Sequence, residues 1–247
     1  MNNFFTIAID TCNHEDWIER CIKTCVTQRY DNFEVILVDA ISDDKTYKIA
    51  EKLAENFNNL KIYQNKIRLP QVANFLWLVK LSKPNSIVVS IDGDDWLKNS
   101  NVLKKLNDAY NSREVWMTYG TYEEFPYRNV SKIYQPYPDD VIINNSFREH
   151  RWLASHLRTF KRELFLKINE EDFKRKDGEW LDTAGDQAIM LPMLEMSGER
   201  SKHMSDALYV YNVANTSRDG AINEPRQVEM ANYVRSLNKY EKLESLW

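Results

Sequence analysis

The stretch SIVVSIDGDDWL, residues 86–97, joins a run of strand-forming residues to a cluster of aspartates. Its first six residues are mostly β-branched and apolar, which is typical of a buried strand. Asp92, Asp94 and Asp95 follow directly, with a glycine between the first two that lets the chain turn. Like charges this close repel one another, and the fold gives no reason for them. We therefore expect a positively charged ligand at the end of this strand.

Strand and helix patterns alternate along the chain before this stretch. Apolar strand patterns occupy residues 4–9, 33–38 and 60–63, and amphipathic helix patterns occupy residues 17–26, 47–57 and 72–79. Ser42 is expected to cap the second of these helices. Near-continuous apolar strands that alternate with amphipathic helices indicate βαβ units and a parallel sheet covered on both faces. The sequence therefore predicts an α/β fold.

The pattern loosens after residue 98. We expect helices at residues 102–110 and 189–194, strands at residues 115–119 and 207–213, long loops over 120–150, and a closing polar helix over 224–247. No repeat, linker or charge block divides the chain. A single domain is the expected organisation.

Composition narrows the classes of function. The 247 residues carry a net charge of −4, which argues against a general nucleic-acid binder, because phosphate binding needs a basic surface. No apolar run is long enough for a membrane span, and the N-terminus lacks the pattern of a signal peptide. Cys21 and Cys25 lie four apart on an apolar helical stripe, as core thiols do, and Cys12 leaves the count odd. A reducing, cytoplasmic compartment is expected.

Acidic residues follow three of the predicted strands: Asp10, Asp39 and the 92–95 cluster. In an open parallel sheet, ligands bind outside the carboxyl ends of the strands. Carboxylate oxygens suit Mg²⁺ or Mn²⁺, which keep some water and let substrate phosphates complete the coordination sphere. An Asp-Gly turn or a helix cap at Asp94 or Asp95 is the alternative. The strand before the cluster and the βαβ array favour the metal.

Several segments together resemble the GT-A glycosyltransferases of the family-2 type. The quoted set is FTIAIDTCNHEDWIERCIKTCVTQRYDNFEVILVDAISDD (residues 5–44), SIDGDDWL (90–97), AGDQAIMLPMLEMSGER (184–200) and DALYVYN (206–212). SIDGDDWL is similar to the DxD signature of that family. Asp10 stands where the family commonly has proline, and residues 40–41 replace its second aspartate and glycine. The resemblance implies a GT-A, Rossmann-like, mostly parallel sheet flanked by helices.

The resemblance implies a UDP-sugar donor site with a Mn²⁺ or Mg²⁺ ion. It assigns Asp39 to the uracil ring or ribose, with Thr11 and Asn13 in the same pocket. Asp92 would contact the ribose or metal-bound water, and Asp94 would ligate the metal. Further candidates are Asp95 as an additional metal ligand or its support, and Arg68 and Asn74 as contacts to the diphosphate or base. A solvated side chain is the alternative for Arg68.

Asp186, on the segment expected beneath the acceptor, is the candidate catalytic residue. It would take the proton from the acceptor hydroxyl in an inverting enzyme, or orient the acceptor in a retaining one. A helix N-cap is its alternative role, and Asp182 is the reserve candidate. The third metal ligand is expected to be His203 or His156, against a packing role for each. Arg158 could neutralise phosphate, and Trp152 could stack on a sugar or base.

Within the family, ASHLRTF (154–160), the GDQ tripeptide and YNVANTSRDG (211–220) resemble a viral and bacterial subgroup. That subgroup includes giant-virus enzymes that glucosylate galactosyl-hydroxylysine on collagen-like proteins. The resemblance implies UDP-glucose as donor, a glycan or glycosylated protein as acceptor, and retention. It also implies a donor half at residues 1–98, an acceptor half at 99–223 and a helical tail at 224–247.

Three rival interpretations remain open. The first is an inverting family-2 sugar transferase for polysaccharide or glycan synthesis. The second is a metal-dependent phosphodiesterase or nuclease, although such sites usually gather more histidines. The third is a nucleotide-sugar binder without catalysis, which the combination of Asp92, Asp94 and Asp186 disfavours. The oligomeric state is left open.

Overall fold

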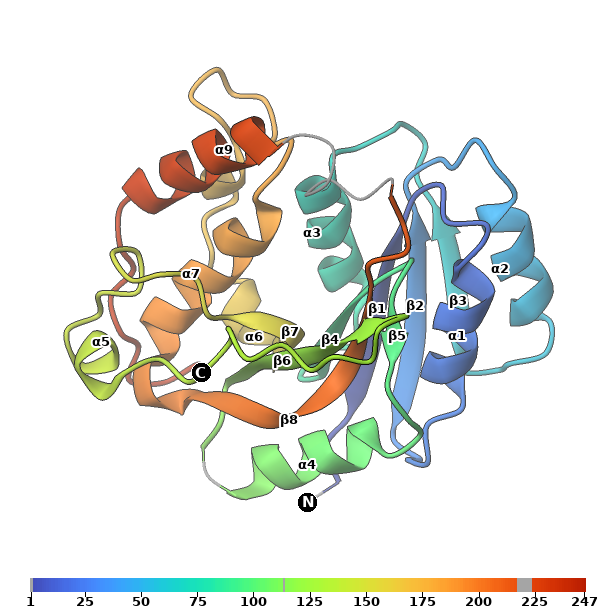
Figure 1. The fold of residues 1–247 in the computed structure, drawn as a ribbon, viewed down its shortest axis with the longest axis horizontal. Helices are drawn as coiled ribbons and strands as arrows, with labels where there is room; N and C mark the ends of the chain where they lie inside the picture. Colours follow the sequence, from blue (N-terminus) through green and yellow to red (C-terminus); the bar gives the residue numbers. More distant parts are fainter. Residues whose placement is uncertain (1, 113, 217–223) are drawn as a thin grey trace.

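Eight strands form one sheet in the order β3-β2-β1-β4-β7-β6-β8-β5 (Figure 1), in a computed structural model that describes residues 2–112, 114–216 and 224–247. The strands are β1 (Phe5–Thr11), β2 (Phe33–Asp39), β3 (Leu60–Gln64), β4 (Ile87–Asp92), β5 (Trp96–Leu97), β6 (Met117–Phe125), β7 (Ser155–Lys161) and β8 (Ser201–Asn212).

The first half of the sheet is parallel, as the alternating pattern predicts. β1 lies between β2 and β4, and β2 continues to β3, all in parallel register. Asp10 pairs in register with Asp92, and Thr11 pairs with Asp39. The three acidic strand ends are therefore side by side at one edge of the sheet.

The second half of the sheet is mixed. β7 runs antiparallel to both β4 and β6, whereas β6 and β8 are parallel. β7 was not predicted from the sequence, because SHLRTFK mixes polar and apolar residues without the continuous apolar run of the other strands. Its position beside β4 brings residues 155–161 next to the strand that ends in the aspartate cluster.

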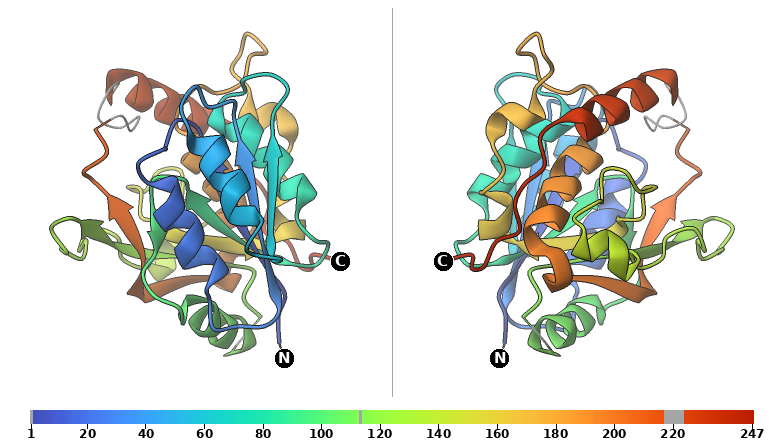
Figure 2. Two further views of the ribbon diagram at one scale, coloured as in Figure 1. Left: turned by 90° about the vertical axis from the view of Figure 1, so that its right-hand side faces the viewer. Right: turned by 90° about the vertical axis from the view of Figure 1, so that its left-hand side faces the viewer.

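Helices cover both faces of the sheet (Figure 2). They are α1 (Ile18–Val26), α2 (Thr46–Ala54), α3 (Gln71–Leu81), α4 (Val102–Ser112), α5 (Asp139–Ile143), α6 (Arg162–Phe165), α7 (Gly185–Ser197) and α9 (Glu224–Ser236). Ile7 and Ile9 of β1 belong to the core cluster under α1, α2 and α4, and Ala8 belongs to the cluster under α3, α7 and α9. This alternation follows from the two-residue period of a strand.

Four expectations about local structure are corrected. The expected loops over 120–150 contain the second half of β6 and the short helix α5. The closing helix ends at Ser236, and the remaining chain packs on the core through Leu246. The second helix begins at Thr46, four residues after Ser42, which binds the Asp39 carboxylate instead. Asp186 is not an N-cap, since α7 begins at Gly185.

Two expectations from composition agree with the structure. Cys21 and Cys25 are buried core thiols, and none of the three cysteines forms a disulfide. Across the described ranges, every helix is too short or too polar to cross a membrane.

Candidate active site at the carboxyl edge of the sheet

A cleft of about 500 Å³ lies over the carboxyl ends of the parallel strands. Asp10 and Thr11 of β1 line it, together with Asp92 at the end of β4 and Asp94 in the turn that follows. The first turn of α7 contributes Asp186. Residues far apart in the sequence therefore meet at the sheet edge where an open α/β fold binds ligands.

Gly93 allows the aspartate turn to approach β1 closely. A Cβ atom at this position would lie 2.3 Å from Oγ1 of Thr11 and 2.8 Å from Nδ1 of His14. Any side chain would push the turn away from the strand. The glycine thus lets Asp92 and Asp94 face the same cleft.

Asp95 also lines the cleft, and its carboxylate anchors the turn to β8. Its carboxylate accepts hydrogen bonds from the Tyr209 hydroxyl and the Asn212 backbone N–H, each at 2.7 Å. Only 1% of Asp95 is exposed, and this burial, with the charges of Asp94 and Asp92, raises the pKa of its carboxyl. Each oxygen of Asp95 thus holds one protein hydrogen bond, which fits the role of supporting the metal site that was the alternative to direct ligation.

Asp92 and Asp94 are the carboxylates that could hold a divalent ion. Asp94 accepts a hydrogen bond from Asn215 at 2.8 Å, and Asp92 accepts one from Gln71 at 3.3 Å. No group of three His, Cys, Asp or Glu side chains in the described residues is arranged to hold a metal. Two carboxylates fit a hydrated Mg²⁺ or Mn²⁺ ion whose remaining ligands are water and substrate oxygens.

The structure does not place His203 with Asp92 and Asp94, the two carboxylates that could hold a metal ion. His203 lines neither cavity, and its ring packs edge-on against Tyr119 with ring centroids 5.4 Å apart. His156 lines the cleft, but its ring is stacked on Tyr209 at 4.4 Å. Burial, together with the charge of Arg158, lowers the pKa of His156, so this imidazole is neutral near pH 7.

Asp39 is completely buried and does not line the cleft. Its carboxylate accepts hydrogen bonds from the backbone N–H and hydroxyl of Ser42 and from the amide of Gln64. The Ser42 hydroxyl in turn accepts a hydrogen bond from the Asn13 backbone N–H. Asp39 therefore supports the loop that carries Asn13, a cleft residue.

The other predicted nucleotide-binding residues lie at or below the cleft. Thr11, Asn13 and Arg68 line it. The Arg68 guanidinium is exposed and donates to the carboxylate of Asp43 at 3.0 Å and to the sulfur of Cys12 at 3.2 Å. Asn74 is buried beneath the cleft, where its amide donates a hydrogen bond to the carboxyl of Asp10.

Asp10, one of the acidic residues that follow the predicted strands, lines the cleft, although the family resemblance implied no particular contact for it. Only 7% of it is exposed, and its Oδ2 atom has no hydrogen-bond partner in the described part of the chain. Burial raises the pKa of its carboxyl from 3.8 to about 8. The signal in the sequence was the aspartate at a strand end where the family commonly has proline.

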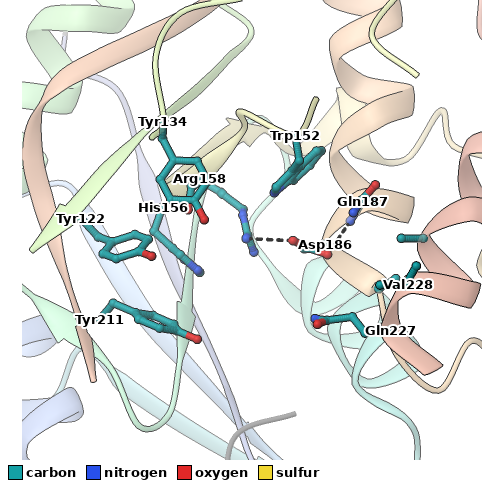
Figure 3. Close-up of a pocket in the computed structure, with 13 residues that line it drawn as sticks. Tyr122, Tyr134, Trp152, His156, Arg158, Asp186, Gln187, Tyr211, Gln227 and Val228 are labelled. Atoms are coloured by element: carbon teal, nitrogen blue, oxygen red, sulfur yellow. Dashed lines mark hydrogen bonds and ion pairs between the residues drawn. The ribbon is translucent and has the colours of Figure 1, made fainter. Parts of the chain in front are cut away.

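A second cavity of about 330 Å³ adjoins the cleft, with Tyr122, Tyr134, Tyr211 and Trp152 in its lining (Figure 3). Figure 3 shows the three tyrosines on one side and polar side chains of α7 and α9 on the other. Aromatic faces opposite hydrogen-bonding groups suit a ligand that has an apolar face and hydroxyls at its edges.

Asp186 stands where the two cavities meet. It lines both of them, as do Arg158 and His156. A guanidinium nitrogen of Arg158 donates to its Oδ2 at 3.2 Å, and the Gln187 backbone N–H donates to its Oδ1 at 2.8 Å. Asp182, the reserve candidate, lines neither cavity and is paired with Arg226 at 2.9 Å.

The mostly parallel sheet therefore has carboxylates at its carboxyl edge and a second cavity beside them, at the edge where open α/β folds bind ligands. The chain belongs to glycosyl transferase family 2, whose family model matches residues 6–168. The expected GT-A fold is confirmed.

Relatives match part of this chain, and solved structures match its fold. A dolichyl N-acetyl-alpha-D-glucosaminyl phosphate 3-beta-D-2,3-diacetamido-2,3-dideoxy-beta-D-glucuronosyltransferase of Methanococcus voltae is 33% identical over 40% of this chain and 33% of its own length. S. aureus TarS 1-349 in complex with UDP-GlcNAc has a TM-score of 0.67 at 20% identity, covering 85% of this chain and 58% of that one.

A mannosyltransferase of Pyrobaculum calidifontis in complex with GDP-Man and Mn²⁺ has a TM-score of 0.64 at 18% identity. That match covers 88% of this chain and 59% of the other. The chain thus spans less than two thirds of the length of each of these three proteins.

Proposed function

We propose that this glycosyltransferase moves a hexose, glucose from UDP-glucose, to a hydroxyl of a glycan or glycosylated protein. The observation that carries the proposal is the position of Asp186. It lines both the cleft that contains Asp92 and Asp94, hereafter the acidic cleft, and the second cavity, which contains Trp152 and Tyr211 and is hereafter the aromatic cavity. Donor and acceptor must meet at one reacting carbon, and this is the boundary at which they would do so. Residues 1–98 would supply most of the donor site.

The donor diphosphate would lie at Asp92 and Asp94, since these two carboxylates fit a hydrated Mn²⁺ or Mg²⁺ ion. Such an ion neutralises charge on the leaving diphosphate. The structural relatives with UDP-GlcNAc, and with GDP-Man and Mn²⁺, support a metal-bound nucleotide sugar here. Arg158 adds a positive charge at the boundary between the cavities.

The acceptor would enter the aromatic cavity. Trp152 and Tyr211 would contact the apolar face of a sugar ring, and Gln187 and Gln227 would bind hydroxyls at its edge. A galactosyl-hydroxylysine acceptor on a collagen-like protein, with retention, rests on the sequence resemblance to the viral and bacterial subgroup.

An inverting sugar transferase for glycan or polysaccharide synthesis is the second candidate. Among the described residues, Asp186 is the acidic side chain that lines both cavities, and this position favours an inverting reaction. In this reaction Asp186 would take the proton from the acceptor hydroxyl, which attacks the anomeric carbon as the nucleoside diphosphate leaves. Arg158 would hold the carboxylate in place.

A screen of nucleotide sugars for Mn²⁺-dependent release of the nucleoside diphosphate, with and without acceptors, tests the proposal. We expect UDP release from UDP-glucose that is faster when a sugar acceptor is present. The anomeric proton of the product, measured by NMR, distinguishes retention from inversion. Release of no nucleotide from any nucleotide sugar, with metal and a range of acceptors present, would contradict the proposed function.

A further inference from the structure

Asp10, which lines the cleft, has a buried carboxyl oxygen without a hydrogen-bond partner among the described residues. Buried polar atoms in folded proteins are nearly always hydrogen-bonded, and an exception calls for an explanation. The Oδ2 atom of Asp10 is buried and has no partner among the described residues, although Asp10 lines the cleft. An oxygen of this kind at a ligand site suggests that its partner belongs to the ligand.

The rest of Asp10 is held firmly. The Asn74 amide donates to the other carboxyl oxygen, Oδ1, and Asn74 itself accepts a hydrogen bond from Asn65 at 2.6 Å. The backbone carbonyl of Asp10 accepts a hydrogen bond from Gly93 at 2.9 Å. Asn74 is completely buried on α3, so this chain of amides fixes the carboxyl in one orientation.

The neighbouring strand ends show why this oxygen differs from other carboxylates near the cleft. Asp39, at the end of β2, has both oxygens bound by Ser42 and Gln64. Asp92, at the end of β4, lies beside Asp94 at the end of the cleft that suits a metal and diphosphate. Asp10 is on β1, the strand between them.

We propose that Oδ2 of Asp10 forms a hydrogen bond with a ribose hydroxyl of the donor nucleotide, which makes Asp10 a specificity residue for ribonucleotides. The inference rests on the proposed function, since it needs a nucleotide in the cleft. The ribose joins the diphosphate to the base, and β1 lies next to the strand that carries Asp92. A hydroxyl both donates and accepts, so it can pair with a carboxyl group in either protonation state.

The diphosphate is a poorer partner for the same oxygen. Phosphate oxygens only accept hydrogen bonds, so they can pair with Oδ2 only while the Asp10 carboxyl is protonated, and an ionised Asp10 repels them, whereas a ribose hydroxyl can pair with both forms. Asp10 would therefore also orient the nucleotide, with its phosphates toward Asp92 and its ribose over β1. A deoxynucleotide would leave the buried oxygen without a partner, which is the situation that hydrogen-bonding sites discriminate against most strongly.

The test is calorimetric binding of UDP, 2′-deoxy-UDP and 3′-deoxy-UDP, with Mn²⁺, to the wild-type chain, Asp10→Ala and Glu34→Gln. Glu34 is the matched control, because it is a buried carboxylate of the same sheet at the opposite end of its strand. Its two oxygens are already bound by Thr6 and Lys61. Thermal melting of each variant shows whether it is folded.

We expect the wild-type chain and Glu34→Gln to bind UDP roughly 5- to 50-fold more tightly than one of the deoxy analogues, the loss expected for one buried hydrogen bond. Asp10→Ala should bind UDP and that analogue equally. Equal binding of all three ligands by the wild-type chain overturns the inference, and this needs no variant. A preference for UDP that survives in Asp10→Ala also overturns it. If the wild-type chain binds no UDP and no other nucleoside diphosphate, the proposed function itself is wrong.

Discussion

The guanidinium of Arg158 on β7 donates a hydrogen bond to the carboxylate of Asp186 on α7 at 3.2 Å, across the boundary between the acidic cleft and the aromatic cavity. The two residues are on elements that are separate in sequence, and each lines both cavities. The pair therefore lies where the proposed donor and acceptor sites meet, which is where the sugar would be transferred from the donor to the acceptor.

Replacing Asp186 by Asn keeps its size and removes its charge. Donor binding should persist, because Asp186 does not belong to the proposed nucleotide contacts, whereas turnover should fall by about 10²–10⁴ if a base is lost. In a retaining enzyme the rate should also fall, through lost orientation of the acceptor. UDP affinity by calorimetry and turnover with acceptor separate the two effects. If Asp186→Asn keeps the turnover of the wild type and Asp182→Asn loses it, the catalytic carboxylate is Asp182 and not Asp186.

The metal prediction concerns Asp94. UDP should bind much more tightly with Mn²⁺ than without it, because an ion held by Asp92 and Asp94 would also bind the diphosphate. The increase should be absent in Asp94→Ala. Calorimetry with Mn²⁺ or EDTA, on wild type and variant, gives the four affinities needed. Equal UDP affinity in all four would exclude the metal bridge.

Asp39 is predicted to act on stability as well as on donor binding. Its buried carboxylate receives three hydrogen bonds from Ser42 and Gln64, so Asp39→Ala should lower the free energy of unfolding by roughly 3 kcal/mol. The donor KM should rise because the loop that carries Asn13 loses its support, while the Mn²⁺ requirement stays unchanged. Denaturant unfolding and donor kinetics measure the two effects. A raised KM at unchanged stability would instead favour direct contact with the nucleotide.

The raised pKa of Asp10 predicts a pH dependence of stability in the metal-free, nucleotide-free protein. The folded protein keeps a proton on this carboxyl up to about pH 8, whereas the unfolded chain releases it near pH 4. Unfolding therefore releases a proton between these values, and stability falls as the pH rises through that window. The limiting slope is about 1.4 kcal/mol per pH unit.

Asp10→Asn removes this titration. The difference in unfolding free energy between the variant and wild type should grow in the variant's favour from pH 5 to pH 7. Denaturant titrations at several pH values in EDTA measure it. A difference that is constant with pH would show that Asp10 is ionised in the folded protein across the range.

The sequence by itself determined the parallel half of the fold and the position of the aspartate motif. The apolar runs of β1, β2 and β4 can be buried only if helices cover both faces, and parallel strands place their carboxyl ends together. The turn through Gly93 then puts Asp92 and Asp94 at that edge. These features depend on local pattern, so they are readable without coordinates.

Only the tertiary structure decided which side chains reach the cleft. β7 carries no clear strand pattern, yet its pairing with β4 brings Arg158 to Asp186. Asp39 and Asp10 end neighbouring strands and look alike in the sequence. Ser42 and Gln64 bind both oxygens of Asp39, whereas Asn74 binds one oxygen of Asp10. Hydrogen-bond partners come from distant segments, so the sequence shows which acids are present, but packing decides which of them keeps an oxygen without a partner among the described residues.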